Sequence, residues 1–131
     1  MAVNPFPITN TWMNYVVLRH TGHPEKPDHF DIMLEITEGE GSQDIALDKM
    51  ECTDVSGTAL TVDPQDMVRR LYLKYEGEMR GNRGFVARVD EGKYQLTDDG
   101  RVIFHGRLLS GAYAFKEENE KVCMYRVGEE Q

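Results

Sequence analysis

The sequence predicts an all-β fold, a small antiparallel β-barrel of about eight or nine strands with at most short helical turns. Three observations predict it. Helical periodicity is nearly absent along the 131 residues. Short segments rich in β-branched and aromatic residues recur throughout the chain. Turns built from glycine, asparagine and aspartate separate these segments at the short intervals typical of barrels and sandwiches.

The first half of the chain supplies four expected strands. Residues 15–20 (YVVLRH) and 29–36 are rich in branched and aromatic side chains, and the loop between them folds the chain back. Two nearby glycines at 39 and 41 mark a turn before the short strand 44–47. Residues 58–62 form the next strand, and the sequence DPQD at 63–66 predicts a turn or a single helical turn.

The second half continues the same pattern. Residues 69–75 alternate polar and apolar side chains, the pattern of a strand. Residues 84–90 and 93–97 predict a hairpin through Glu91 and Gly92. Asp-Asp-Gly at 98–100 is a strong hairpin signal that leads into the strand 101–105. Strands at 111–115 and 122–127 complete the series.

The chain length fits one domain, residues 1–131, with the barrel at 14–127 and loose ends at 1–12 and 128–131. Cys52 and Cys123 lie far apart and form no CxxC pair, so we expect free thiols in a reducing cytoplasm. No secretory signal is evident, and no apolar run approaches the ~20 residues of a membrane helix. We therefore expect a cytoplasmic protein without membrane contact.

The charge is unevenly distributed. A net charge of −8 argues against a protein that wraps nucleic acid, because affinity for the phosphate backbone comes from Lys and Arg. The segment 69–88, which we call the basic segment, nevertheless has six basic and two acidic residues. Its basic residues are Arg69, Arg70, Lys74, Arg80, Arg83 and Arg88. A phosphate-facing patch and a solvated pair of strands with alternating charge both fit this pattern.

Three of the four histidines lie within ten residues, beside an aspartate that could share a metal ion. Residues two apart share one face of a strand, so His29 and Asp31 lie together while Phe30, Ile32 and Leu34 face a core. His20 ends the preceding strand and would join them if the two strands pair. Two nitrogen ligands and one oxygen ligand with open positions suit Mn²⁺, Fe²⁺ or Zn²⁺. From spacing alone, a structural role for the pair at 29 and 31 stays open.

The remaining motifs favour structural roles. His23 lies between prolines in a loop and is expected to be exposed. The GNRG sequence at 81–84 is not a P-loop, because no Lys-Ser/Thr follows, and a hairpin turn is the expected role. The position of His105 at the end of a strand favours a structural role over a role as a metal ligand or base. No Ser-His-Asp or Cys-His arrangement stands out.

A strand that ends in His (15–20, YVVLRH) is followed by a loop and by a strand that begins His-aromatic-Asp (29–35, HFDIMLE). With further segments in the same order, this opening resembles that of the 3′-phosphoesterase domain of bacterial DNA ligase D, a domain of the DNA polymerase/ligase N-terminal family, whose pattern is strand–His, loop, His-aromatic-Asp-x-Arg-x-Glu. Residues 45–49 (IALDK) occupy the place of its tryptophan-containing segment that ends in Pro-Lys. Residues 72–77 (YLKYEG) are similar to its Tyr-x-x-Phe-Glu-Gly.

The resemblance continues toward the C-terminus. Residues 81–84 (GNRG) and 89–94 (VDEGKY) look like its glycine-rich loop and its Trp-Asp-x-Gly-x-Trp strand pair. Residues 105–115 (HGRLLSGAYAF) are similar to its His-Gly-x-x-Leu-x-Gly-x-Trp ending. The resemblance covers about residues 14–127. Each motif is loose, but the ordered set is more specific than any one of them.

The resemblance implies a stand-alone short version of that domain, a β-barrel that removes 3′-terminal ribonucleosides or 3′-phosphates from DNA or RNA. It implies Mn²⁺ as the cofactor, with Zn²⁺ as the alternative. His20, His29 and Asp31 fall on the metal ligands, and Tyr72 falls on a tyrosine beside the scissile phosphate. The implied partners are a nucleic-acid 3′ end and a ligase or polymerase of a repair pathway.

Two positions depart from the family pattern. Met33 stands where the family has an arginine, and Val68 stands where it has a histidine, and both family residues contact phosphate. An arginine supplies paired hydrogen bonds and a charge that a thioether cannot replace. Arg69 and Arg70, next to Val68, and Arg83 in the glycine-rich loop are candidates to bind the phosphate from another direction.

Two classes of function therefore stay open. A metal-dependent phosphoesterase is favoured by the set of two histidines and one aspartate. A catalytically inactive homologue that binds nucleic acid or a protein partner is favoured by the apolar residues at positions 33 and 68. A third hypothesis, an acidic protein-interaction module, depends on the net charge alone.

Overall fold

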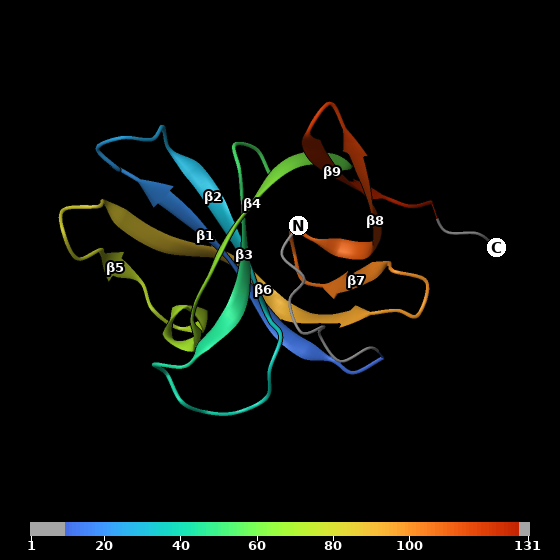
Figure 1. The fold of residues 1–131 in the computed structure, drawn as a ribbon, viewed down its shortest axis with the longest axis horizontal. Coiled ribbons are helices and arrows are strands. Elements are labelled where there is room, and N and C mark those ends of the chain that lie inside the picture. The colour runs from blue at the N-terminus through green and yellow to red at the C-terminus, as the bar shows by residue number, and fades with distance from the viewer. Residues whose placement is uncertain (1–9, 129–131) are drawn as a thin grey trace.

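A computed structural model describes residues 10–128 and shows a closed antiparallel barrel of eight strands with one additional strand (Figure 1). The predicted all-β class is confirmed. The parts of the expected loose ends at residues 1–9 and 129–131 lie outside the described residues. Within the part of the chain that the structure describes, no helix has the length and apolar character needed to span a membrane.

Within residues 10–128, nine strands form a single sheet. They are β1 (Met13–Thr21), β2 (His29–Glu35), β3 (Ile45–Cys52), β4 (Ala59–Arg69), β5 (Gly77–Glu78), β6 (Phe85–Leu96), β7 (Val102–His105), β8 (Ser110–Glu118) and β9 (Lys121–Arg126). One 3-10 turn, η1 (Arg70–Leu73), connects β4 to β5. The order around the barrel is β1-β2-β3-β4-β9-β8-β7-β6, and pairing of β1 with β6 closes it. The short strand β5 pairs with the start of β6.

Three predicted local structures are wrong, and the first is the hairpin through Glu91 and Gly92. Both residues lie inside the single twelve-residue strand β6. The glycine is needed for close packing, because a Cβ atom there would overlap the backbone carbonyl of His105 and press on the ring of Tyr15. A strand-interior glycine often marks such an approach rather than a turn.

The predicted turn at 63–66 and the predicted strand at 69–75 are also wrong. Residues 63–66 belong to β4, and Pro64 pairs with Met50 of β3. Strand β9 covers β4 only at Ala59–Val62, so beyond that point one side of β4 is an edge where proline is tolerated. The chain then turns into η1 at Arg70, whose side chain is buried.

Two apolar cores lie on opposite faces of β1 and β2. On β1, Tyr15 and Val17 pack into the first core, whereas Val16 and Leu18 pack into the second. This alternation is the two-residue period of a strand. The first core fills the barrel interior and includes Ile32, Leu34, Leu60, Phe104, Tyr113 and Met124. The second is smaller and comprises Val16, Leu18, Met33, Leu47 and Val86, with Val68, Tyr72, Leu73, Tyr75 and Met79 packed against it.

Asp90 is a buried hydrogen-bond acceptor that fixes the β7–β8 connection. Its carboxylate accepts hydrogen bonds from the Tyr15 hydroxyl at 2.8 Å and from the backbone N–H groups of Arg107, Leu108 and Leu109 at 2.8, 3.1 and 3.0 Å. Burial, followed by this hydrogen bond and the negative charge of Asp90, raises the pKa of Tyr15 far above its ordinary value. Burial likewise raises the pKa of Tyr94.

The raised pKa values of Tyr15 and Tyr94 predict that the protein becomes less stable at alkaline pH. A group whose pKa is raised in the folded state contributes stability that is complete below its unfolded pKa, about 10 for tyrosine, and is lost as pH rises above it. We expect the free energy of unfolding to fall above pH ~10, by up to ~1.4 kcal/mol per pH unit for each tyrosine. Urea unfolding of the Tyr15→Phe protein between pH 9 and 11 should show a shallower fall than wild type. Tyr125→Phe, at an exposed tyrosine, is the control, and equal slopes in all three proteins would contradict the prediction.

Candidate metal centre

Two neighbouring strands bring the predicted metal ligands together. His20 lies near the end of β1 directly opposite His29, the first residue of β2, and Asp31 follows two residues later. All three side chains point to the face of the second core, and all three residues are buried. One ligand atom from each residue lies within 4.8 Å of the other two. The strand ends that carry these residues lie at the left of Figure 1, where the end of β1 pairs with the starts of β2 and β6.

Backbone carbonyl groups set the tautomers of both histidines. His20 Nε2 lies 2.7 Å from the carbonyl oxygen of Arg83, and His29 Nδ1 lies 2.9 Å from that of Pro27. A carbonyl oxygen only accepts hydrogen bonds, so each of these ring nitrogens carries a proton and donates it. In a neutral imidazole the other nitrogen then presents a lone pair. Histidines that bind metals are commonly held in this way by a donor bond from the second ring nitrogen.

The two remaining nitrogens face the Asp31 carboxylate. His20 Nδ1 lies 3.3 Å from Oδ2, and His29 Nε2 lies 3.3 Å from Oδ1. Within the described residues, His29 Nε2 and Asp31 Oδ1 are also the two buried side-chain polar atoms without a hydrogen-bond partner. Buried polar groups without partners cost free energy, and lone pairs facing a carboxylate repel each other. A cation placed among these atoms would satisfy all of them.

Glu51 is a fourth acceptor that the sequence analysis missed. It lies directly opposite Asp31 on β3, and its Oε2 atom is 3.6 Å from His29 Nε2. Lys26 Nζ holds the same oxygen at 2.8 Å, and Lys49 Nζ lies at 3.7 Å. Burial alone would raise the pKa of Glu51, but the hydrogen bond from Lys26 and the neighbouring positive charges lower it below its ordinary value. The sequence signal that could have identified Glu51 is the two-residue strand period through Lys49 and Glu51. The strand expected at 44–47 ended before these residues.

His20 and Asp31 of the cluster line a pocket of about 180 Å³, whereas His29 lines a second, neighbouring pocket. Tyr72, predicted from the resemblance to lie beside the phosphate, lines this pocket from η1. Arg83 lines it from the β5–β6 loop, where it is exposed. His23 also lines it and is half-buried rather than exposed as expected, with its ring 5.6 Å from that of His20. The complete lining is His20, His23, Lys26, Asp31, Met33, Lys49, Glu51, Val68, Tyr72, Met79, Arg83 and Val86.

Arg69 and Arg70 do not line the pocket, although the sequence made them candidates for phosphate binding. Arg69 is exposed at the end of β4. The guanidinium of Arg70 is buried and uses all five N–H donors within the protein. Its acceptors are Glu35 Oε2, Asp44 Oδ2, the Gly41 carbonyl, and the carbonyl and hydroxyl oxygens of Thr37, at 2.8 to 3.1 Å. With its donors occupied, Arg70 has a structural role.

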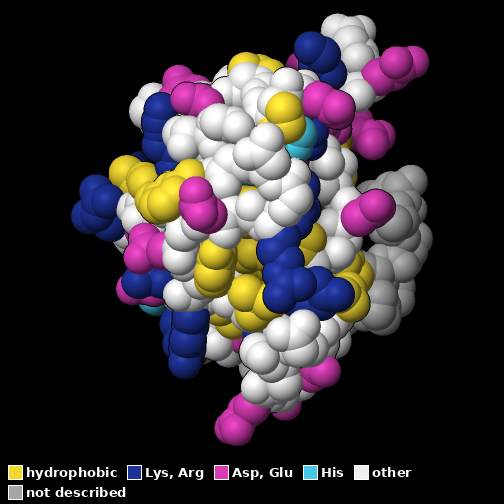
Figure 2. All heavy atoms as spheres, turned by 90° about the vertical axis from the view of Figure 1, so that its left-hand side faces the viewer, with side chains coloured by type: hydrophobic (Ala, Val, Ile, Leu, Met, Phe, Trp, Pro, Cys, Tyr) yellow, Lys and Arg dark blue, Asp and Glu magenta, His cyan; other side chains and the backbone are white. Residues whose placement is uncertain are grey.

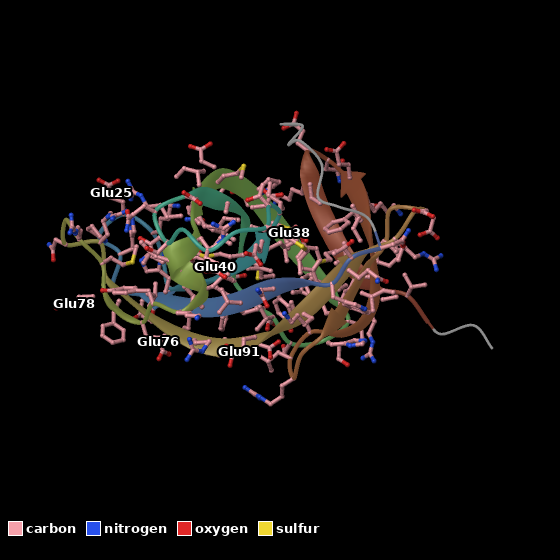
Figure 3. All side chains as sticks on the ribbon, turned by 90° about the horizontal axis from the view of Figure 1, so that it is seen from below. Glu25, Glu38, Glu40, Glu76, Glu78 and Glu91 are labelled. Atoms are coloured by element: carbon pink, nitrogen blue, oxygen red, sulfur yellow. The ribbon has the colours of Figure 1, made fainter. Side chains whose placement is uncertain are left out.

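The basic segment is thus divided among different roles. Arg88 pairs with Glu76 and Glu91, which Figure 3 places on the β5–β6 side of the molecule. Arg80 and Arg83 are exposed on the loop before β6, and no ion pair joins either to a carboxylate of the described residues. Figure 2 shows Lys and Arg side chains beside hydrophobic ones near the middle of this end, with acidic side chains around them. Only part of the segment is therefore available to an anionic ligand.

The other two sequence motifs have local structural roles. The glycine-rich residues 81–84 connect β5 to β6 in a tight turn, in which the Met79 N–H donates to the Gly84 carbonyl at 2.7 Å. Gly84 has φ +98°, and a Cβ atom there would overlap the carbonyl of Thr21. His105 lies away from the site on β7 and packs its ring 4.5 Å from that of Trp12.

Fold and site together define a class: a closed antiparallel β-barrel with a buried His-His-Asp cluster at one end. No protein-family model matches the chain. No curated protein matches it either.

Proposed function

We propose that this protein is a metal-dependent phosphoesterase that hydrolyses phosphoesters at the 3′ ends of DNA or RNA. One observation carries the metal part of the proposal: in each histidine one ring nitrogen is held by a backbone carbonyl, and the other faces a buried carboxylate that has an unpartnered oxygen. The two-nitrogen, one-oxygen set suits Mn²⁺, with Zn²⁺ as the alternative. Glu51 is close enough to add a second carboxylate.

The reaction type is supported by the ordered resemblance to the 3′-phosphoesterase domain of DNA ligase D. His20, His29 and Asp31 occupy the positions of that domain's metal ligands, and in this chain they lie within reach of one ion. Tyr72, at the position of its phosphate-contacting tyrosine, lines the same pocket. We include a cytoplasmic setting and a ligase or polymerase partner in this proposal because the same resemblance implies a role in nucleic-acid repair.

The side chains of the pocket have distinct roles in this proposal. A bound divalent cation would polarise a phosphoryl oxygen and lower the pKa of a coordinated water. The Arg83 guanidinium and the Tyr72 hydroxyl would donate hydrogen bonds to the phosphate. Arg83 has a second role, because its carbonyl fixes the tautomer of His20. The carbonyl of Pro27 does the same for His29, so both ligands are oriented before any ion binds.

A non-catalytic homologue that binds nucleic acid is the second candidate. Met33 and Val68, which replace the family's arginine and histidine, are apolar members of the pocket wall and favour this alternative. Metal binding without hydrolysis would be its signature.

We expect wild-type protein to bind one Mn²⁺ and to shorten a primer that ends in a single 3′ ribonucleotide, with EDTA abolishing the reaction. His29→Ala removes one of three ligands and should reduce metal affinity by more than ~100-fold, since even changes outside the ligand shell cost 10–100-fold. Isothermal titration and a denaturing gel measure the two effects.

His105→Ala is the matched control, because this histidine lies away from the site. Wild-type protein that binds no divalent metal would overturn the proposal, and metal binding without cleavage would favour the non-catalytic alternative. Equal loss of metal affinity in both histidine variants would assign the effect to general destabilisation.

A further inference from the structure

The pocket has a polar side and an apolar side. The polar side consists of His20 and Asp31 of the metal cluster, with His23, Lys26, Lys49, Glu51 and Arg83. The apolar side consists of Met33, Val68, Met79 and Val86, with the ring of Tyr72. These apolar side chains belong to the second core, so packing holds them in place. A ligand that fills this pocket therefore meets charge on one side and hydrocarbon and thioether groups on the other.

The free hydrogen-bond donors of the pocket lie on its polar side, and the Tyr72 hydroxyl is the exception. The ammonium group of Lys26 is bound to Glu51, and that of Lys49 lies near the same carboxylate. The Nε–H of Arg83 donates a hydrogen bond to the carbonyl of Arg80. The donors left for an anion are the terminal nitrogens of Arg83, the Tyr72 hydroxyl, the Nε2–H of His23, whose Nδ1 accepts from the Glu25 N–H, and the remaining N–H groups of the two lysines. Met33, Val68, Met79 and Val86 have no side-chain donor.

This one-sided arrangement of donors distinguishes two kinds of phosphoester. A terminal phosphomonoester has a charge of about −1.5 to −2 at pH 7 and three strong acceptor oxygens. A phosphodiester has one negative charge and two such oxygens, and its next substituent is an uncharged sugar. A phosphate oxygen turned toward the apolar side would lose water without gaining a donor, which costs free energy. A sugar ring turned toward the apolar side would lose little free energy.

We propose that the pocket is specific for phosphodiester ends: it binds the terminal nucleoside against the apolar side and rejects a terminal phosphomonoester. This inference rests on the proposed function and narrows its substrate to one of two classes. The pocket volume of about 180 Å³ fits one ring-sized group, since a cavity of ~150 Å³ holds benzene. We assign that place to the terminal ribose, with its base directed outward.

The reaction that follows is a single hydrolysis. Water adds to phosphorus, the bond between phosphorus and the 5′ oxygen of the terminal nucleoside breaks, and a proton from the water passes to that oxygen. The products are a free nucleoside and a nucleic-acid strand with a 3′-phosphate. Because the site rejects this new monoester, the reaction stops there, and a separate phosphomonoesterase must act before a polymerase or ligase can use the end.

The test compares two primers of the same sequence with wild-type protein and Mn²⁺, one ending in a single 3′ ribonucleotide and the other in a 3′-phosphate. We expect the first to yield a 3′-phosphate strand that accumulates, identified by mass spectrometry. The second should react at least ~100-fold more slowly, the scale of one missing transition-state contact. Comparable rates, or faster removal of the phosphate, would overturn the specificity while leaving the proposed function intact. Cleavage of neither primer, with metal bound, would overturn both.

A variant tests the cause. Met33→Arg places a guanidinium on the apolar side and should raise the rate on the 3′-phosphate at least ~10-fold relative to the diester. Met33→Leu, which keeps the side apolar, should leave the ratio unchanged. Since Met33 is 3% exposed, circular dichroism must first show that the arginine variant is folded. If the arginine variant does not fold, the comparison of the two primers with wild-type protein decides the proposal. If the folded arginine variant kept the wild-type ratio of the rates on the 3′-phosphate and on the diester, the assignment of the terminal nucleoside to the apolar side would be wrong.

Discussion

Asp31→Asn is expected to abolish tight metal binding and, in EDTA, to make the protein more stable. The neutral amide is a weaker ligand than the carboxylate, so metal affinity should fall by more than ~100-fold. Without metal, however, the amide N–H can donate to a histidine lone pair that now faces a carboxylate oxygen at 3.3 Å. One new buried hydrogen bond should add ~0.5–1.5 kcal/mol to the free energy of unfolding. Opposite effects on binding and stability are typical of functional sites.

Urea unfolding with EDTA and with Mn²⁺ measures both effects. Wild-type protein should gain ~2.7 kcal/mol at a metal concentration of one hundred times Kd, and the variant should gain almost nothing at the same concentration. Asp99→Asn, on the exposed turn between β6 and β7, serves as the control and should behave as wild type. A variant that is less stable than wild type in EDTA would show that Asp31 is a structural partner of protonated histidines instead.

Arg70→Ala should cause the largest loss of stability, ~3–5 kcal/mol, the usual cost of removing one partner from a buried ion pair. The guanidinium is 7% exposed and bonds to Glu35, also 7% exposed, at 3.0 Å. Removing it leaves the Glu35 carboxylate buried, with Asn14 as its remaining hydrogen-bond donor. It also leaves the β2–β3 loop without the contacts at Thr37, Gly41 and Asp44 that fix its shape.

Arg69→Ala is the matched control, since it removes the adjacent, exposed arginine and should change the free energy of unfolding by less than ~0.5 kcal/mol. Chemical unfolding of the two variants measures the difference. If Arg70→Ala were as stable as wild type but bound nucleic acid less well, Arg70 would be a phosphate ligand after all. Arg83→Ala should give the reverse pattern, with little effect on stability and weaker nucleic-acid binding.

Two of the three wrong local predictions, the turns at 63–66 and at 91–92, share one physical cause. Glycine, proline and aspartate predict turns when only their neighbours in the sequence are known. Gly92 lies within a continuous strand because a carbonyl from β7 and a ring from β1 approach its backbone. Pro64 lies within β4 because the neighbouring strand on one side has already ended. Both reasons are contacts between segments far apart in the chain.

The amino-acid sequence alone determined the all-β class and the shared face of His29 and Asp31, because the two-residue strand period is a local property of the chain. The convergence of His20 with this pair was predicted on the condition that the two strands pair, and the structure shows that they do. The tertiary structure decided what surrounds these residues. It selected the carbonyl of Arg83, 63 residues from His20, as the group that fixes the tautomer. It brought Glu51 opposite Asp31 on β3 and placed Arg70 against Glu35 instead of at the pocket. Strand register and burial decide such long-range partnerships, and neither is encoded in a short stretch of sequence.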